Sequence, residues 1–180
     1  NLSSQVMGMK IGVPKETFPG ERRVSLVPAV LPSLTKAGIE VLVESGAGVS
    51  AAYPDRVYSE KGATLVPDRD TLFSQVEIII QVRGLGANPN AGRQDLARLR
   101  KGQVVLGLLE PLAEPQSVRD MAQTGVTAFA MELIPRITRA QTMDVLSSMA
   151  TVSGYKAVLM AADTLPRMFP LLMTAAGTVS

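Results

Sequence analysis

With 180 residues, 46% of them apolar and 19% charged, the chain is long enough and apolar enough to bury one globular core. The formal net charge of +2, with no basic cluster beside aromatic residues, argues against a nucleic-acid partner. The chain has no cysteine and no histidine, which excludes disulfides, thiolate metal sites and the commonest general base. We therefore expect no metal site, and chemistry that depends on carboxylates, lysine, tyrosine or a reactive cofactor.

The N-terminal residues 1–8 precede Met9 and lack the apolar core of a secretory signal. We interpret them as a cloning remnant or a disordered arm. The chain also lacks an uninterrupted run of about 20 apolar residues, so we expect no membrane-spanning segment. The fold is therefore sought from Met9 onward.

Short apolar runs alternate with helical patterns from residue 10 onward. Residues 10–13 and 39–44 are predicted strands, and residues 26–38 are a predicted helix that Pro32 shortens or kinks. A strand, a helix and a second strand in that order indicate a right-handed parallel crossover.

The same alternation continues to residue 132. The further predicted elements are strands at 63–66, 77–82, 103–109 and 126–132, and helices at 69–75 and 114–125. The β-branched run at 77–82 is typical of a strand buried on both faces, and the Gly-, Asn- and Pro-rich residues 84–92 predict a surface loop. This order predicts an α/β fold: a doubly wound, mostly parallel, flavodoxin- or Rossmann-like sheet with helices on both faces.

A glycine-rich turn follows the second predicted strand. Gly46-x-Gly48-x-x-Ala51 has the letters of a dinucleotide-binding turn, and Asp68 lies about 20 residues further on, where a ribose partner is expected. Such a turn needs a helix directly after its glycines, because the helix N-terminus holds the pyrophosphate. Pro54 would break that helix early, so we interpret the glycines as a structural turn and Asp68 as a helix N-cap or loop residue.

Two stretches are more specific, KIGVPKETFPGERRVSLVP at 10–28 and AMELIPRITRAQTMDVLSSMATVSGYKAV at 130–158. With ESGAGVSAAY, they resemble the N-terminal domain shared by alanine dehydrogenase and the NAD(H)-binding α subunit of proton-translocating NAD(P) transhydrogenase. The resemblance runs from Met9 to the end of the chain. Within it, PRITRAQTMDVLSS is similar to the transhydrogenase branch and not to alanine dehydrogenase.

The resemblance implies that Arg136, Gln141, Asp144 and Ser147 surround a nicotinamide and its ribose. Gln141 and Asp144 would offer the donor and acceptor that an amide requires, and Arg136 would pair with Asp144 or move toward the ring. Hydride transfer between two nicotinamides needs proximity and orientation rather than proton transfer, which suits a chain without histidine. The alternative is a polar strand-to-helix loop with Asp144 near an N-cap.

The alanine dehydrogenase branch implies a different set of functional positions. That branch holds a carboxylate substrate with an arginine and a lysine and uses a histidine for acid–base work. Arg23 matches the arginine, but Arg83 stands at the lysine position and Glu110 near the histidine position. These departures argue against alanine oxidation. Lys15 and Glu16, with Arg23, match the shared N-terminal motif, and their alternative role is a salt-bridge cluster that fixes the first loop.

The resemblance also implies a domain plan: an N-terminal α/β domain at 9–134, then the nicotinamide-side loop, a long helix near 144–164 and the start of an absent Rossmann domain within 135–180. The chain would be a fragment of the NAD(H)-side subunit, inactive alone, that passes hydride from NADH to NADP⁺ on a partner domain. The implied setting is a homodimer on the cytoplasmic face of a bacterial inner membrane, with only an indirect link to the membrane subunit. Two alternatives stay open: a divergent NAD-dependent amino-acid dehydrogenase, and a non-catalytic assembly module that pairs through 133–165.

Overall fold

The computed structural model describes residues 8–167, 169, 172–174 and 177–179. The arm proposed for residues 1–8 lies outside the described residues except for Gly8, whose N–H donates to the Gly38 carbonyl. The chain divides into two compact units, Asn1–Ile134 and Pro135–Ser180, which we call unit 1 and unit 2. Each unit is described by itself.

Unit 1 contains a six-stranded sheet in which each pair of neighbouring strands is parallel. Its strands are β1 (Lys10–Val13), β2 (Glu40–Glu44), β3 (Thr64–Val66), β4 (Ile78–Arg83), β5 (Val104–Leu108) and β6 (Thr127–Ala130). The spatial order β3-β2-β1-β4-β5-β6 is the order of doubly wound dinucleotide-binding sheets. The predicted fold class is therefore confirmed.

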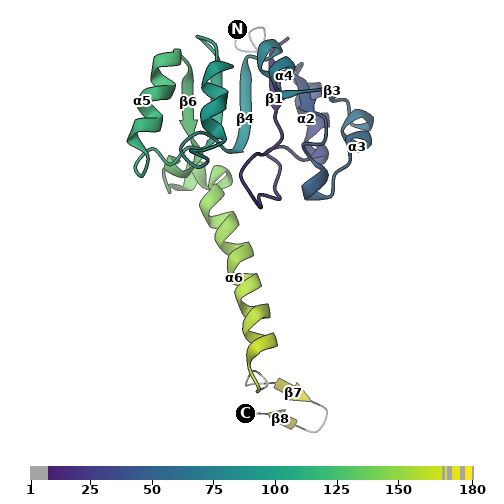
Figure 1. The fold of residues 1–180 in the computed structure, drawn as a ribbon. Coiled ribbons are helices and arrows are strands. Elements are labelled where there is room, and N and C mark those ends of the chain that lie inside the picture. The colour runs from purple at the N-terminus through teal and green to yellow at the C-terminus, as the bar shows by residue number, and fades with distance from the viewer. Residues whose placement is uncertain (1–7, 168, 170–171, 175–176, 180) are drawn as a thin grey trace. The chain divides into compact units, whose positions relative to one another are not determined.

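Helices lie on both sides of this sheet, as Figure 1 shows. One face carries α2 (Leu31–Lys36) and α3 (Asp55–Glu60), whose Leu31 and Tyr58 pack with alternate residues of β2. The other face carries α4 (Arg69–Gln75) and α5 (Pro115–Thr124), which contribute Leu72, Phe73 and Met121 to the core cluster that contains Leu42 of β2. Alternation along β2 thus supplies both cores.

Short helices and caps connect these elements. The 3₁₀ turns of unit 1 are η1 (Pro28–Val30), η2 (Val49–Ala51), η3 (Gly92–Ala97) and η4 (Met131–Leu133). Asp68 is the N-cap of α4 and accepts the Thr71 N–H at 2.7 Å, so its predicted capping role is confirmed. α5 begins at Pro115 and ends before Gly125, whose φ of 76° provides the left-handed cap predicted for it.

Three expectations for unit 1 differ from the structure. The helix expected over 26–38 is only η1 followed by α2, and Pro32 lies in its first turn, where a missing N–H does no harm. β4 is not buried on both faces. The helices α2 and α3 contact β2 and β3 rather than β4, so Ile78 and Ile80 are only half-buried. The loop after β4 is not wholly on the surface, since residues 84–88 are buried.

The two edge strands of the sheet, β3 and β6, differ in how they are protected from pairing with another chain. β3 has three residues and is followed directly by Pro67 and Asp68. β6 holds no charged residue, and its Phe129 is 55% exposed. The Thr127 N–H donates to the Gln103 carbonyl, next to β5. Because successive backbone N–H groups of a strand point to opposite sides, the Ala128 N–H points away from β5 to the open edge of the sheet.

Unit 2 contains η5 (Thr138–Met143), the 20-residue helix α6 (Val145–Thr164) and the antiparallel strands β7 (Leu172–Thr174) and β8 (Gly177–Val179). No residue of α6 is buried, and its apolar side chains lie on all sides. Contrary to our expectation, this helix is long and apolar enough to cross a membrane. One such helix is weak evidence of a membrane span, because a helix that is apolar on all sides is also typical of a segment covered by other parts of a protein.

Candidate functional site

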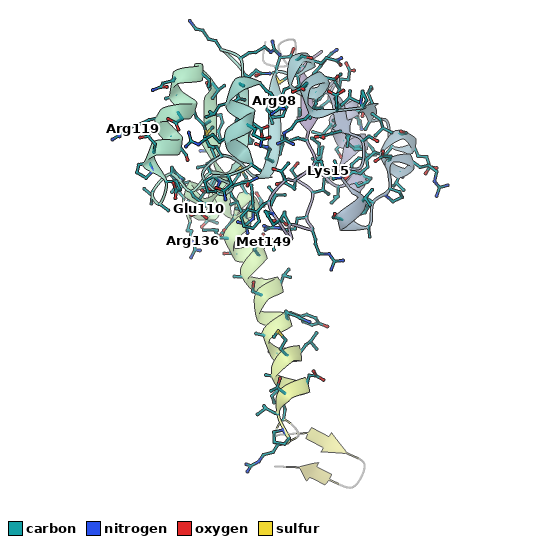
Figure 2. The ribbon with its side chains drawn as sticks, in the orientation of Figure 1. Lys15, Arg98, Glu110, Arg119, Arg136 and Met149 are labelled. Carbon is teal, nitrogen blue, oxygen red and sulfur yellow. The ribbon has the colours of Figure 1, made fainter. Side chains whose placement is uncertain are left out.

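The four residues expected near a nicotinamide all lie in one polar segment of unit 2, residues 135–147. Arg136 and Gln141 are exposed, and Gln141 belongs to η5. Asp144 is the N-cap of α6, and Ser147 lies exposed in the first turn of that helix. Figure 2 labels Arg136 near the start of α6. Of the four, the structure joins Ser147 to Asp144 by hydrogen bonds and brings Arg136 near enough to influence the Asp144 carboxyl, while contacts of all four with a ligand stay a prediction.

The Asp144 carboxylate is fixed by Ser147. The Ser147 hydroxyl donates to Oδ2 at 2.6 Å, and its backbone N–H donates to Oδ1 at 2.9 Å. These two bonds, aided by the positive charge of Arg136, hold the pKa of Asp144 below its ordinary value. Asp144 is therefore ionised at neutral pH, and each oxygen retains a lone pair for a further donor. This is the capping geometry of the alternative interpretation, and it leaves room for a ligand contact as well.

Arg136 and Gln141 have no side-chain hydrogen bond or ion pair within the described part of the chain. The expected pairing of Arg136 with Asp144 is therefore an electrostatic attraction and not a formed salt bridge. Backbone bonds from Ala140 to Ile137 and from Asp144 to Gln141 hold the segment as a 3₁₀ turn. The turn is fixed while these two side chains stay free to contact a ligand.

In unit 1, the residues of the shared N-terminal motif lie in residues 14–25, which we call the strap. The strap follows β1 and contacts the end of β4. Glu21 accepts hydrogen bonds from Arg23 at 2.6 and 2.8 Å and from Arg83 at 2.9 Å. These bonds from Arg23 and Arg83 lower the pKa of Glu21 to about 2. Of the cluster expected among Lys15, Glu16 and Arg23, only Arg23 forms a salt bridge; its partner is Glu21, which the sequence pattern did not single out and which also binds Arg83.

Glu16 and Lys15 are bound differently. The Glu16 carboxylate accepts the backbone N–H groups of Val82 at 2.6 Å and Arg83 at 3.1 Å. Burial raises the pKa of Glu16 despite these bonds. The Lys15 side chain is exposed, and only its backbone is engaged, by Glu44 and Arg69. Figure 2 labels Lys15 at the start of the strap.

A second network, which the sequence did not predict, lies beneath the strap. Arg69 donates to both oxygens of Asp95 at 2.6 Å and lies 3.5 Å from Glu44. The buried Gln81 donates to the same Asp95 carboxylate at 3.2 Å. Arg69 and Asp95 are 26 residues apart, so only the fold could bring them together.

The glycine turn binds its own chain. The Gly46 N–H donates to Asp55 at 2.8 Å, and the N–H groups of Ala47, Val49 and Ala51 donate to backbone carbonyls. A Cβ at Gly48 would lie 2.5 Å from the Tyr58 ring, so glycine is needed there for close packing. Only the three-residue η2 follows before α3 begins at Asp55. The interpretation as a structural turn is confirmed.

An apolar recess of about 350 Å³ lies between α5 and β6. Its walls include Val118, Met121 and Phe129, and no charged side chain lines it. A cofactor site combines apolar walls with converging polar groups, which this recess lacks.

Comparison with known proteins adds what geometry alone does not give. The family model described as "Alanine dehydrogenase/PNT, N-terminal domain" matches residues 12–153. The chain belongs to this family. It is 41% identical over 171 residues to an NAD(P) transhydrogenase subunit alpha polypeptide of Rhodospirillum rubrum, covering 95% of this chain and 44% of that protein.

Other members agree with this assignment. The solved transhydrogenase of Sinorhizobium meliloti superposes with a TM-score of 0.81 at 39% identity, covering 94% of this chain and 49% of that chain. Alanine dehydrogenase of Mycobacterium tuberculosis is more distant, at 31% identity over 159 residues, covering 88% of this chain and 41% of that protein. The chain thus spans less than half the length of these relatives, and the expected resemblance is confirmed.

The positions that the alanine dehydrogenase branch uses can now be placed in this family member. Arg23 and Arg83 meet at the Glu21 carboxylate. Glu110 is exposed, has a φ of 50°, and donates its backbone N–H to Glu132. Lysine and histidine are absent from these positions, and the described residues contain no group of three or more potential metal ligands.

Proposed function

We propose that this chain is part of the NAD(H)-side subunit of a proton-translocating NAD(P) transhydrogenase. In this role it helps to transfer hydride from NADH to NADP⁺ held by a partner domain. The observation that carries the proposal is the polar segment 135–147, where Asp144 is oriented and ionised, and where the side chains of Arg136 and Gln141 have no bond within the described residues. When bound, NADH would supply the hydride, so the chain needs no acid or base of its own.

The donor set of the segment fits a carboxamide. Asp144 would accept from the amide N–H₂ group, and Gln141 would donate to the amide oxygen. The Ser147 hydroxyl donates to Asp144 and keeps its lone pairs free, so it would accept from the amide or from a ribose hydroxyl. A carboxylate and a hydroxyl already held in place would orient the ring at a small entropic cost.

Arg136 would place a positive charge near the nicotinamide ring. Its guanidinium is exposed and unpaired within the described residues, and it is close enough to Asp144 to lower the pKa of that carboxyl. Attracted by Asp144 but not bonded to it, Arg136 would be free to contact the nicotinamide when the ring binds. Arg136, Gln141 and Asp144 are the residues we assign to hydride transfer.

The partners follow from the same proposal. The NADP(H)-binding domain would meet the segment 135–147 directly, and the membrane subunit would be linked only indirectly. The apolar surface of α6 supports a covered position for this helix, either in a homodimer or against a further domain of the subunit. We propose a cytoplasmic position at the inner membrane.

The test is hydride transfer from NADH to an NADP⁺-loaded partner, measured with the complete subunit. Asp144→Asn keeps the helix cap, since asparagine caps as well as aspartate, but removes the charge. We expect it to reduce the transfer rate by at least tenfold while calorimetry shows NADH affinity mostly retained. Arg136→Ala should behave in the same way, and Arg139→Ala, three residues further along the chain and also exposed, is the matched control. Equal rates in all three variants would refute the proposal.

One observation keeps the amino-acid dehydrogenase alternative in view, namely that Arg23 and Arg83 share one carboxylate at the carboxyl end of the central strand β4. Turnover of an amino acid with NAD⁺ by the complete protein, abolished by Arg23→Ala, would establish it. The assembly-module alternative is favoured by the uncovered apolar α6. It would be established if neither NADH binding nor turnover is detected while self-association depends on α6.

A further inference from the structure

The Glu132 side chain bonds to the end of β5 just where the backbone of β6 leaves the sheet. The paired residues of the two strands end with Gly107 and Ala130, and the chain then enters the 3₁₀ turn η4. Beyond that last pair, the backbone N–H groups of Leu109 and Glu110 both donate to Oε1 of Glu132, the first at 2.8 Å. A side-chain oxygen thus takes the place of the backbone carbonyl that a longer β6 would have offered.

The turn to which Glu132 bonds is itself tightly fixed. Glu110, labelled in Figure 2, has a φ of 50°, in the left-handed region that a residue with a Cβ adopts only at a steric cost. Its carbonyl accepts the Glu114 N–H at 2.8 Å, and a Cβ at Gly86 would lie 1.7 Å from the Leu109 oxygen. The end of β5 is therefore a rigid point of attachment for Glu132.

The Glu132 carboxylate is also shielded from solvent on its second oxygen. Oε2 is buried, and it has no hydrogen-bond partner among the residues that the structure describes. Leaving a buried acceptor unpaired costs free energy, so this position of the carboxylate is maintained by the two bonds at Oε1. Those bonds, rather than a salt bridge or hydration, explain why the side chain lies where it does.

After Glu132 the chain has only local hydrogen bonds within the described residues. The bonds of residues 133–144 join them to one another, to Met131 or to the first turn of α6. Pro135 has a fixed φ and restricts Ile134 before it to extended backbone, in agreement with the Ile134 ψ of 125°. A short and stiff connection therefore leads from Glu132 to Arg136.

We propose that Glu132 is a positioning residue for hydride transfer: its carboxylate ties the chain to the end of β5 where the chain leaves the sheet, and so fixes the start of the segment 135–147. Glu132 touches no reactant and acts through Arg136, four residues further on. The inference rests on the function proposed above. Hydride transfer depends on orientation, and a displacement of about 1 Å can lower the rate of such a step about 100-fold.

The test separates the reach of the Glu132 side chain from its charge. Glu132→Asp keeps the charge but is one methylene shorter, so it loses the bonds to Leu109 and Glu110. Glu132→Gln loses the charge but keeps the reach and an oxygen that accepts. In the complete subunit, Glu132→Asp should lower the rate of hydride transfer from NADH to an NADP⁺-loaded partner by about tenfold or more, while calorimetry shows NADH affinity mostly retained. Glu132→Gln should recover most of the lost rate.

Glu77 provides the matched control at the other end of the sheet. Its carboxylate accepts the backbone N–H of Lys10 at 2.7 Å, at the amino ends of β1 and β4. Glu77→Asp should lower the urea midpoint of unfolding, as Glu132→Asp does, and leave hydride transfer unchanged. An unchanged rate in Glu132→Asp, equal losses of rate in the two aspartate variants, or no recovery in Glu132→Gln would overturn the proposal.

A second measurement does not depend on the proposed function. The heteronuclear NOE of the Arg136 amide, measured by NMR on this chain, reports backbone motion on the picosecond to nanosecond timescale. It should fall in Glu132→Asp and return toward the parent value in Glu132→Gln. A parent subunit that passes no hydride to NADP⁺ would refute the proposed function alone. An Arg136 NOE that is the same in Glu132→Asp and the parent would refute the role of Glu132.

Discussion

The two units use their polar and apolar groups in opposite ways. In unit 1 the apolar side chains of β2 and its helices are buried, and charged groups such as Arg69 and Glu21 are bound by residues of the same unit. In unit 2 the apolar residues of α6 are exposed, and Arg136 and Gln141 have no partner among the described residues. Unit 1 thus binds many of its charged groups internally, whereas unit 2 presents polar and apolar groups that the described residues leave uncovered.

The largest expected effect is on the buried network of unit 1. Arg69→Met removes the two-pronged cation from Asp95, whose side chain is 10% exposed, and leaves that buried carboxylate with only Arg98 at 3.6 Å and the Gln81 amide. We expect a loss of about 3 kcal/mol in the free energy of unfolding, measured by urea denaturation. The matched control is Arg56→Met, which breaks an exposed pair with Glu60 and should cost less than about 0.5 kcal/mol. Similar losses in the two variants would mean that unit 1 does not depend on its internal pairing.

The next effect is a pH dependence of stability that belongs to unit 1. The pKa of Glu21 is lowered from 4.5 to about 2, so its contribution is present above pH 4.5 and is lost as pH falls toward 2. The shift corresponds to about 2–3 kcal/mol, allowing for the partial exposure of Arg23 and Arg83. Glu16 has the opposite sign, because its pKa is raised and its cost is relieved as pH falls toward 4.5.

Acid unfolding followed by circular dichroism would test this prediction. Glu21→Gln should remove most of the loss between pH 4.5 and 2, and it should lower stability at neutral pH. A variant that unfolds along the same acid profile as the parent would show that other carboxylates control the transition.

The smallest effect distinguishes the surface of unit 2. Gly154 lies in the middle of α6, and no atom lies within 4 Å of where its Cβ would be. Gly154→Ala should therefore stabilise the helix by about 1 kcal/mol, seen as a higher melting temperature of the helical signal. If the same substitution weakens self-association or hydride transfer in the complete protein, then a partner approaches the helix closely at this glycine. Unchanged assembly would place the partner on another side of α6.

Local signals predicted most of unit 1. α4 spans the seven residues expected of it because Asp68 caps it, and α5 ends where Gly125 takes a positive φ. The surface loop expected at 84–92 was wrong for residues 84–88, because Gly84 and Gly86 allow the chain to pass closely under Leu109. Close approach of two backbones distant in sequence leaves no periodic pattern to read.

The candidate site also has parts that the sequence predicted and parts that it did not. The resemblance indicated the segment 135–147, and its capping geometry could be foreseen from Asp144 before a helix. The cluster around Glu21 was foreseen only in part, although the adjacent letters ERR put a carboxylate beside two cations. The Arg69–Asp95 pair gave no signal, since it joins α4 to η3 through the folded sheet.

The open edge at β6 has a practical consequence for anyone who handles this chain. Within the described residues of unit 1, β6 is an uncharged edge strand whose Ala128 N–H points to the open side, a template on which another extended chain can add by backbone hydrogen bonds. We therefore expect concentrated samples of these 180 residues to aggregate through β6 rather than through β3, which is blunted by Pro67 and Asp68. A lysine at position 128 would supply the gatekeeping charge that natural edge strands carry, without touching the ladder to β5.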